Sequence, residues 1–196
     1  MAAGFTYNLT PEEVKEERYD VETGRRRRGP YKLDTANLPV GEYLPSFTPI
    51  AADLKRKTAK VAIRVEVAEA FTTSGSNTTL KIKKTPFVYA NMYLGNGSNG
   101  AQVSSIDKSN TDYDTLTLAA DFGANLKVGD VLFEASAVGG TTPKVTANSA
   151  LYERHKIGDG ELVTLLMKAF EIEPAKLAIP FHKKDKTNMP YFQFNE

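Results

Sequence analysis

The residue types that most often carry acid–base and metal chemistry are scarce in this chain. It has two histidines, His155 and His182, which do not form a HxH or HxxxH pair. It has no cysteine, which excludes disulfides, thiolate nucleophiles and cysteine-bound zinc. No Gly-x-Ser-x-Gly segment marks a nucleophilic serine. We therefore expect no catalytic residue, no metal ligand and no cofactor, and we expect that the protein is not an enzyme.

A glycine-rich segment could in principle bind a nucleotide. Residues 95–100, GNGSNG, match the G-x-G-x-x-G string of dinucleotide sites. In such sites the string opens a helix whose N-terminus holds the pyrophosphate. Here the next residues, AQVSSID, have the pattern of a strand. We therefore predict a hairpin turn at this position.

Residues 107–114 are rich in side-chain oxygens, as a calcium loop would be. Such a loop needs Gly at its sixth position and Glu at its twelfth. Counted from Asp107, those positions hold Asp112 and Leu118. We predict instead a turn in which Asp and Asn side chains bond their own backbone.

The run Arg25, Arg26, Arg27 and Arg28 is the one dense cluster of charge. Such a run can bind phosphates, so nucleic-acid binding stays open as an alternative. No aromatic residue that could stack on bases lies among the arginines, and four glutamates precede them between residues 12 and 17. An arm that docks on an acidic protein surface explains the run at least as well.

Composition gives little support to a membrane or nucleic-acid role. The 196 residues include 25 basic and 24 acidic ones, for a net charge of +1. The first residues lack the basic and apolar pattern of a secretion signal, and no apolar stretch reaches the about 18 residues that cross a membrane. We expect a soluble protein made in the cytoplasm of its host.

The first of three regions, residues 1–52, is predicted to be an attachment arm. Prolines spread through it break long helices and central strands. One short helix is predicted from Thr10 to about Tyr19, with Thr10 as its cap. Residues 38–50 are predicted to be extended and polyproline-like. Their apolar side chains need cover from the domain or from a partner: Leu38, Val40, Tyr43, Leu44, Phe47 and Ile50.

The second region, residues 53–175, reads as a β domain. Short strands separated by turn signals are predicted at 60–71, 79–84, 86–95, 101–107, 114–120 and 129–135. Their spacing predicts an all-β fold, mainly an antiparallel sandwich or a barrel-like domain. Residues 161–172 fit a helix or a strand, and we favour a strand because β-branched residues begin the segment.

The third region, residues 176–196, is a tail that ends in Tyr191, Phe192 and Phe194. Such an aromatic end is unusual for a free terminus. We predict that it docks on the domain or on a neighbouring chain.

Four segments carry a resemblance to a known family: LPVGEYLPSFTPIAADLKRKTAKV, KTPFVYANMYLGNG, SSIDKSNTDYDTLTLAADFG and VGDVLFEASAVGGTTP. They resemble the head fibre proteins of tailed phages and prophages, notably of Bacteroidales hosts, over about residues 37–175. The resemblance implies a virion structural protein on the outer capsid surface, usually a homotrimer. It implies the major capsid protein or another head protein as partner, and no catalytic residues.

Residues 1–52 are therefore predicted to attach the protein to the capsid, while residues 53–175 are exposed and could contact a host-surface glycan. The candidate attachment residues are Arg25, Arg26, Arg27, Arg28, Tyr43 and Phe47. Three alternatives stay open. They are a bacterial surface module that binds carbohydrate, a nucleic-acid-binding protein that uses the arginine run, and a glycan hydrolase with two carboxylates in a groove.

Overall fold

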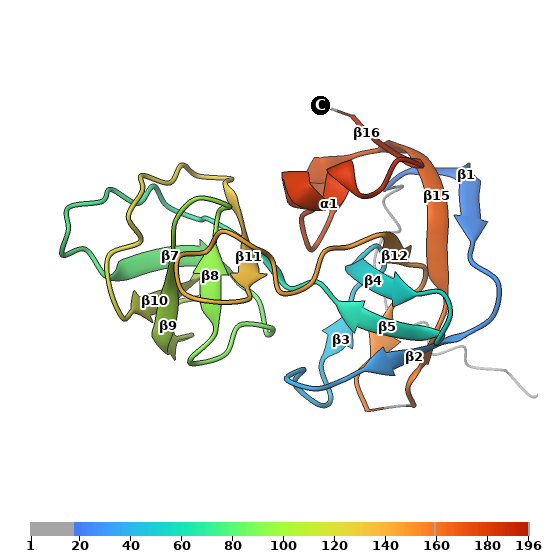
Figure 1. Ribbon diagram of the computed structural model, residues 1–196, viewed down its shortest axis with the longest axis horizontal. Helices are drawn as coiled ribbons and strands as arrows, with labels where there is room; N and C mark the ends of the chain where they lie inside the picture. The colour runs from blue at the N-terminus through green and yellow to red at the C-terminus, as the bar shows by residue number, and fades with distance from the viewer. Residues whose placement is uncertain (1–17, 159, 196) are drawn as a thin grey trace, which may run out of the picture.

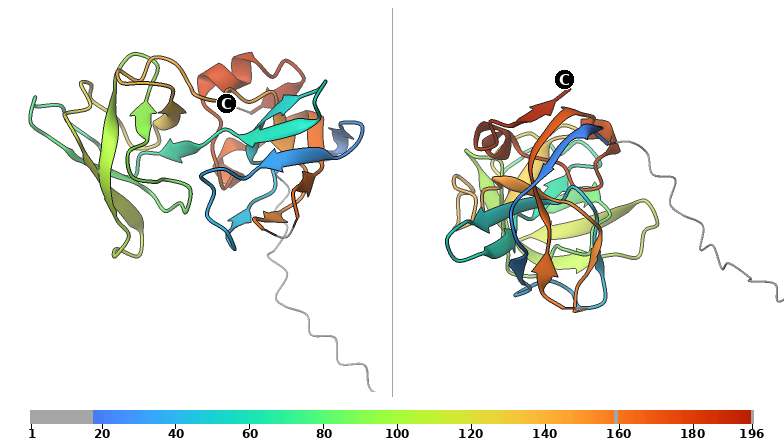
Figure 2. Two further views of the ribbon diagram at one scale, coloured as in Figure 1. Left: turned by 60° about the horizontal axis from the view of Figure 1, so that its bottom comes forward. Right: turned by 90° about the vertical axis from the view of Figure 1, so that its right-hand side faces the viewer.

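The computed structural model describes residues 18–158 and 160–195. Over these residues nearly all regular structure is β, so the predicted all-β fold class is confirmed. Two lobes lie side by side, as Figures 1 and 2 show. The terminal lobe comprises residues 18–63 and 145–195, without 159, and the inserted lobe comprises residues 64–144. The chain crosses from one lobe to the other twice.

A curled sheet forms the terminal lobe, in the order β1-β15-β12-β4-β5-β2-β14. Only Thr164 separates β14 from β15 in sequence, so the last strand of the path continues into its second strand and the sheet closes on itself. Closure removes the free edges that an open sheet would expose. The strands are β1 (Asp20–Arg26), β2 (Tyr31–Asp34), β4 (Pro49–Asp53), β5 (Thr58–Val61), β12 (Ser149–Leu151), β14 (Leu162–Val163) and β15 (Leu165–Ile172).

A second closed sheet forms the inserted lobe, in the order β6-β11-β8-β9-β10-β7. A bridge between Val67 and Ile82 joins its two ends. Side chains alternate along each strand, as in β7, where Leu80 and Ile82 are buried and their neighbours face outward. The strands are β6 (Arg64–Glu66), β7 (Thr79–Lys83), β8 (Tyr93–Gly95), β9 (Gly100–Asp107), β10 (Tyr113–Leu118) and β11 (Val131–Ala135).

The C-terminal segment, residues 174–195, adds three short elements to this frame. They are the 3₁₀ turn η1 (Pro174–Lys176), the helix α1 (Lys183–Thr187) and the strand β16 (Phe192–Phe194), which pairs with β15 in parallel. Phe192 is buried, and the rings of Phe181 and Phe194 lie 5.2 Å apart. Of the two docking sites predicted for the aromatic tail, the structure shows the one on its own chain.

Two buried clusters hold the molecule together. One runs through both lobes, from Leu33 and Ile50 in the terminal lobe to Leu80 and Leu94 in the inserted lobe. The other lies in the terminal lobe under the C-terminal segment and joins Phe47, Phe181, Met189 and Phe192 to its strands. The C-terminal segment is therefore part of the core packing.

Several strand predictions are confirmed and two are wrong. Of the strand predicted over 86–95, only Tyr93–Gly95 (β8) is a strand, and residues 86–92 form turns and irregular backbone in which Asn91 has a φ of +69°. Residues 161–172 form β14 and β15, as favoured, and GNGSNG forms the hairpin turn between β8 and β9. The single strand predicted over 60–71 is instead split, because β5 ends in one lobe and β6 begins in the other. All residues from 61 to 65 are buried, since this link passes between the lobes, and that burial conceals the break in the sequence pattern.

The predicted helix from Thr10 lies outside the described residues, apart from Arg18 and Tyr19, which are not helical. From residue 20 the proposed arm forms strands of the terminal lobe. Its extended stretch, residues 38–50, contains the start of β4 and a short strand β3 (Tyr43–Leu44), which pairs with β13 (His155–Lys156). Four of its six apolar residues are buried by their own chain, and Val40 and Tyr43 remain exposed. The attachment role of the arm stays a prediction.

The glycines of the GNGSNG hairpin serve close backbone packing. Gly140, with φ of +61°, lies against Gly95 and Gly100, and a Cβ on Gly140 would lie 2.3 Å from the Asn99 carbonyl oxygen. The Gly97 N–H donates to the Gly140 carbonyl at 3.0 Å. The glycines that match the nucleotide motif thus allow the loop between β11 and β12 to pack closely against the hairpin.

Asp and Asn side chains accept hydrogen bonds from nearby backbone N–H groups, as predicted for residues 107–114. The Ser109 N–H donates to Asp107 and the Asp112 N–H donates to Asn110, at 2.9 and 2.8 Å. The segment is therefore an Asx turn.

Asp121 fastens the loop at residues 73–75. Its carboxylate accepts the Thr73 hydroxyl at 2.6 Å, the Gly123 N–H at 2.8 Å, the Ser74 N–H at 2.9 Å and the Gly75 N–H at 3.0 Å. These bonds, led by the Thr73 hydroxyl, favour the charged form and lower the pKa of Asp121 from 3.8 to about 2.

We expect the hydrogen bonds to the Asp121 carboxylate to stabilise this loop fully above about pH 4 and to be lost as the pH falls through about 2. The reason is that the pKa of Asp121 is lower in the folded state than in the unfolded chain. In NMR titrations the Ser74 and Gly75 amides should shift with a midpoint near pH 2. Asp121→Asn should abolish the step. A midpoint near 4 would contradict the described bonds.

Candidate attachment surface and the junction between the lobes

The four arginines predicted to mediate attachment lie on or just after β1. Arg25 and Arg26 are exposed on the strand, where Arg26 stacks on the Tyr152 ring with its guanidinium carbon 5.2 Å from the centroid. Arg27 is turned toward the body, since its guanidinium donates to the Ser149 hydroxyl at 2.6 Å and to a backbone carbonyl. Arg28 is exposed. Three of the four are therefore accessible.

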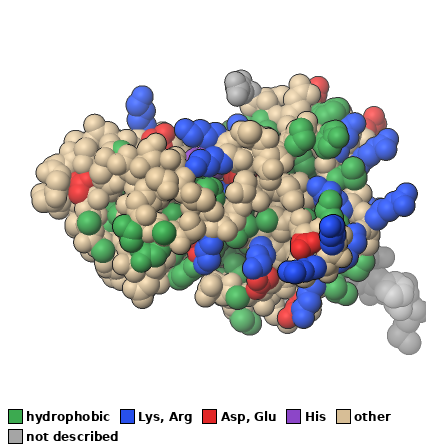
Figure 3. Space-filling model, viewed as in Figure 1, with side chains coloured by type: hydrophobic (Ala, Val, Ile, Leu, Met, Phe, Trp, Pro, Cys, Tyr) green, Lys and Arg blue, Asp and Glu red, His purple; other side chains and the backbone are tan. Residues whose placement is uncertain are grey.

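The accessible arginines continue into a larger cationic area. The Lys57 ammonium donates to the Arg28 carbonyl at 3.1 Å, which places the β4–β5 turn beside the arginine run. We define the basic surface as Arg25, Arg26, Arg28, Lys55, Arg56 and Lys57, all of them exposed. Figure 3 shows that lysine and arginine side chains gather over the terminal lobe on the face in view.

Charge is divided unequally between the lobes. The terminal lobe, without residue 159, has 17 basic and 10 acidic side chains, whereas the inserted lobe has 7 and 8. The remaining residues, 1–17, 159 and 196, carry one basic and six acidic side chains, which brings the total of the chain to +1. Among the described residues, an excess of positive charge is therefore found on the terminal lobe and not on the inserted lobe, and such an excess favours contact with anionic surfaces.

The structure does not group the two aromatic candidates with the arginines. Tyr43 is 44% exposed on β3, where the Arg154 guanidinium lies 3.8 Å from its ring centroid. Phe47 is 2% exposed and packs against Tyr19 and Phe181, with ring centroids 5.1 and 5.9 Å away. Tyr43 can touch a partner, while Phe47 serves packing.

A buried ion pair joins the lobes at the point where the chain crosses between them. Arg64 opens β6, Asp185 lies in α1, and both side chains have zero exposure. Two nitrogens of Arg64 donate to the carboxylate at 2.7 and 2.6 Å. The same carboxylate accepts the N–H of Ala147 at 2.8 Å, on the returning crossover. Asp185 thus accepts hydrogen bonds from both chain segments that connect the lobes.

Two neighbours of Asp185 reach the inserted lobe. The His182 ring meets the Phe133 ring edge-on at 4.8 Å. Burial, with a contribution from Arg64, lowers the pKa of His182 from 6.5 to about 4, so this histidine is neutral at pH 7. The Lys184 ammonium donates to the Thr141 carbonyl.

Sequence reasoning missed this junction. Arg64 and Asp185 are 121 residues apart, and nothing local marks either as a partner of the other. The tail did offer one signal. His182 precedes a short charged run with an acidic residue three positions on, and together they form a capping box at the start of α1.

Comparison with known proteins gives one finding. The family model described as head fiber protein matches residues 1–194, nearly the whole chain. No curated protein and no solved structure matches the chain. No helix in the described ranges is long and apolar enough to cross a membrane.

Proposed function

The chain belongs to the phage head fibre protein family, and on that premise we propose that its terminal lobe binds the outer surface of the capsid through the basic surface. The inserted lobe then points away from the shell. The partner is the major capsid protein or another head protein that presents an acidic face. The protein acts as a structural part of the virion and not as a catalyst.

The unequal charge of the two lobes is the observation that carries this proposal. Complementary charge speeds encounter and fixes orientation when two proteins bind. A terminal lobe with 17 cations against 10 anions among its described residues would dock in one orientation on an acidic shell. The nearly balanced inserted lobe would stay outside and remain free for other contacts.

The attachment role predicted for residues 1–52 fits this orientation through their exposed members. Arg25, Arg26 and Arg28 contribute half of the basic surface. Tyr43 can add an aromatic contact from the same lobe. Assembly as a homotrimer, implied by the family resemblance, belongs to the proposal, as does contact of the exposed lobe with a host-surface glycan.

Reversing three charges on the basic surface tests the attachment. We expect Arg25→Glu/Arg26→Glu/Arg28→Glu to raise the apparent Kd for capsids that lack the fibre by at least about tenfold, because like charges facing each other cost several kcal/mol. A matched variant reverses three exposed lysines of the inserted lobe, Lys83, Lys108 and Lys127, and should bind normally. Equal loss in both variants would reject the assignment.

Charge reversal is a cleaner test than removing the whole arm. Deleting residues 1–52 would take away β1, β2 and β3 and most of β4, and so open the terminal sheet. A shorter deletion of residues 1–17 leaves every described strand in place. It separates the contribution of those residues from that of the basic surface.

The nucleic-acid alternative predicts a different result with the same variants. The triple arginine variant would then lose affinity for duplex DNA, and binding of the unchanged protein would fall steeply with salt. Strong DNA binding without capsid binding would favour that alternative.

A further inference from the structure

The C-terminal segment lies between the two lobes and contacts both. With the terminal lobe it shares a strand pairing, β16 on β15, and the aromatic cluster of Phe47, Phe181 and Phe192. Its contacts with the inserted lobe are made by side chains. They include the Arg64–Asp185 pair, the Lys184–Thr141 bond, the edge contact of His182 with Phe133 and the packing of Ile179 in the core cluster that runs through both lobes. The segment thus pairs its backbone with a strand of one lobe and reaches the other lobe through side chains.

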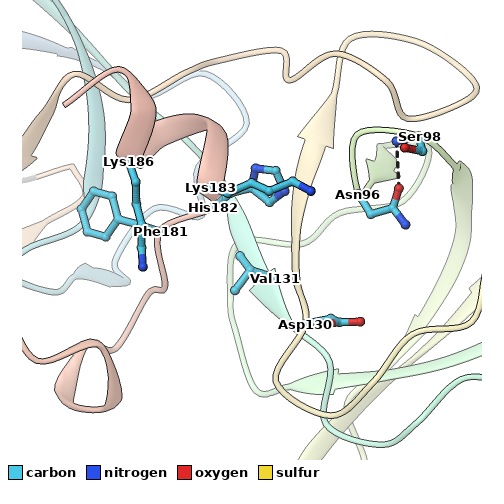
Figure 4. A pocket seen from close by; sticks show the side chains of 8 residues that line it. All are labelled: Asn96, Ser98, Asp130, Val131, Phe181, His182, Lys183 and Lys186. Atoms are coloured by element: carbon cyan, nitrogen blue, oxygen red, sulfur yellow. Dashed lines mark hydrogen bonds between the residues drawn. The ribbon is translucent and has the colours of Figure 1, made fainter. Parts of the chain in front are cut away.

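Hollows flank the segment where it passes between the lobes. A pocket of about 430 Å³ separates Lys183 and Lys186 from Asn96, Ser98 and Asp130 of the inserted lobe. In Figure 4 the Lys183 side chain extends from α1 toward the hairpin that carries Asn96 and Ser98. A second hollow of about 430 Å³ lies beside Ala178 and Ile179, and a third of about 380 Å³ lies beside Pro174 and Leu177. Because these hollows are open at the surface, solvent borders the contact between the segment and the inserted lobe.

Only two short links join the lobes covalently, at Ala62–Ile63 and near Val145–Thr146. The Asp185 carboxylate accepts hydrogen bonds from Arg64 beside the first link and from the N–H of Ala147 beside the second. The Asn188 amide adds a bond to the Ala147 carbonyl at 3.0 Å. One five-residue helix, α1, therefore restrains both links where rotation of one lobe against the other would occur.

From these contacts we infer that residues 174–195 act as a clasp that sets the orientation of the inserted lobe on the terminal lobe. With the clasp released at α1, each closed sheet keeps its strands, and only the two links and the apolar core shared by the lobes still resist rotation of one lobe against the other. The clasp thereby controls the direction in which the inserted lobe is presented. This inference concerns the isolated chain and holds whatever surface the terminal lobe binds.

Spin labels on the full chain test the clasp directly, because the protein has no cysteine of its own. Labels at Lys32→Cys on β2 and Thr117→Cys on β10 place one exposed probe on each lobe. Pulsed electron resonance should give a narrow distance distribution for the otherwise unchanged protein. Lys184→Ala/Asp185→Asn should at least double its width, while hydrogen exchange still shows protected strands in both lobes.

A milder variant covers the case in which Asp185→Asn unfolds the terminal lobe. His182→Gln/Lys184→Ala removes two contacts with the inserted lobe and keeps the Arg64–Asp185 pair, so a smaller broadening is expected. Lys183→Ala, on the same helix but exposed, serves as the control and should leave the distribution narrow. Unchanged width in both clasp variants, or loss of protection in both lobes together, would overturn the inference.

Discussion

Replacing Asp185 by alanine should lower the free energy of unfolding by about 3–5 kcal/mol. The Arg64 guanidinium would keep zero exposure and lose its counter-charge. The N–H groups of Ala147 and His182 would lose their acceptor as well. Leaving a buried charge and buried donors unpaired costs far more than an exposed ion pair contributes.

Urea denaturation followed by circular dichroism measures this effect. Lys183→Ala is the matched control, two residues away on the same helix and exposed, and it should change stability by no more than about 0.5 kcal/mol. A loss below about 1 kcal/mol for Asp185→Ala would mean that water or another group reaches Arg64, and the junction would not be the buried one described.

Replacing Phe47 by alanine should also cost about 3–5 kcal/mol, because a large side chain is removed from a filled core. Phe47 is 2% exposed, and Tyr19, Phe181 and Phe192 pack their rings around it. Below its lowered melting temperature, the variant should still bind capsids, since Phe47 has almost no surface to offer a partner.

Tyr43→Ala is the natural comparison for Phe47→Ala. Tyr43 is 44% exposed, so its loss should change stability by less than about 1 kcal/mol. Melting curves and capsid binding measured on both variants separate packing from attachment. If Phe47→Ala kept its stability and lost capsid binding, Phe47 would be an attachment residue and not a packing residue.

Local pattern was enough to predict the class of fold. Alternating side chains, such as Leu80 and Ile82 against their exposed neighbours, give strands wherever one face of a sheet is buried. The GNGSNG turn and the strand at 161–172 followed from the same local rules. These features depend on residues close together in sequence.

The division into lobes could not be predicted in the same way. The link at Ala62 and Ile63 is as apolar as the strands on either side of it, because it passes between the lobes. The partner of Arg64 lies 121 residues away. Such long-range pairing leaves no periodicity in the sequence, and only the folded chain shows that the arginine is buried.

The candidate site was partly predictable. A dense run of arginines marks a charged surface from sequence alone, and three of its four members are exposed. Composition could not show that Lys55, Arg56 and Lys57 lie beside them, since the pairing of β2 with β5 creates that neighbourhood. It also could not tell Tyr43 from Phe47, which are both aromatic residues of one extended stretch.

Electron cryomicroscopy of capsids decorated with the full-length protein is the most direct test of the proposed orientation. We expect the terminal lobe to lie against the shell, with Arg25, Arg26 and Arg28 facing an acidic surface, and the inserted lobe to be farther out. Density that placed the inserted lobe on the shell, with the basic surface facing solvent, would contradict the proposal.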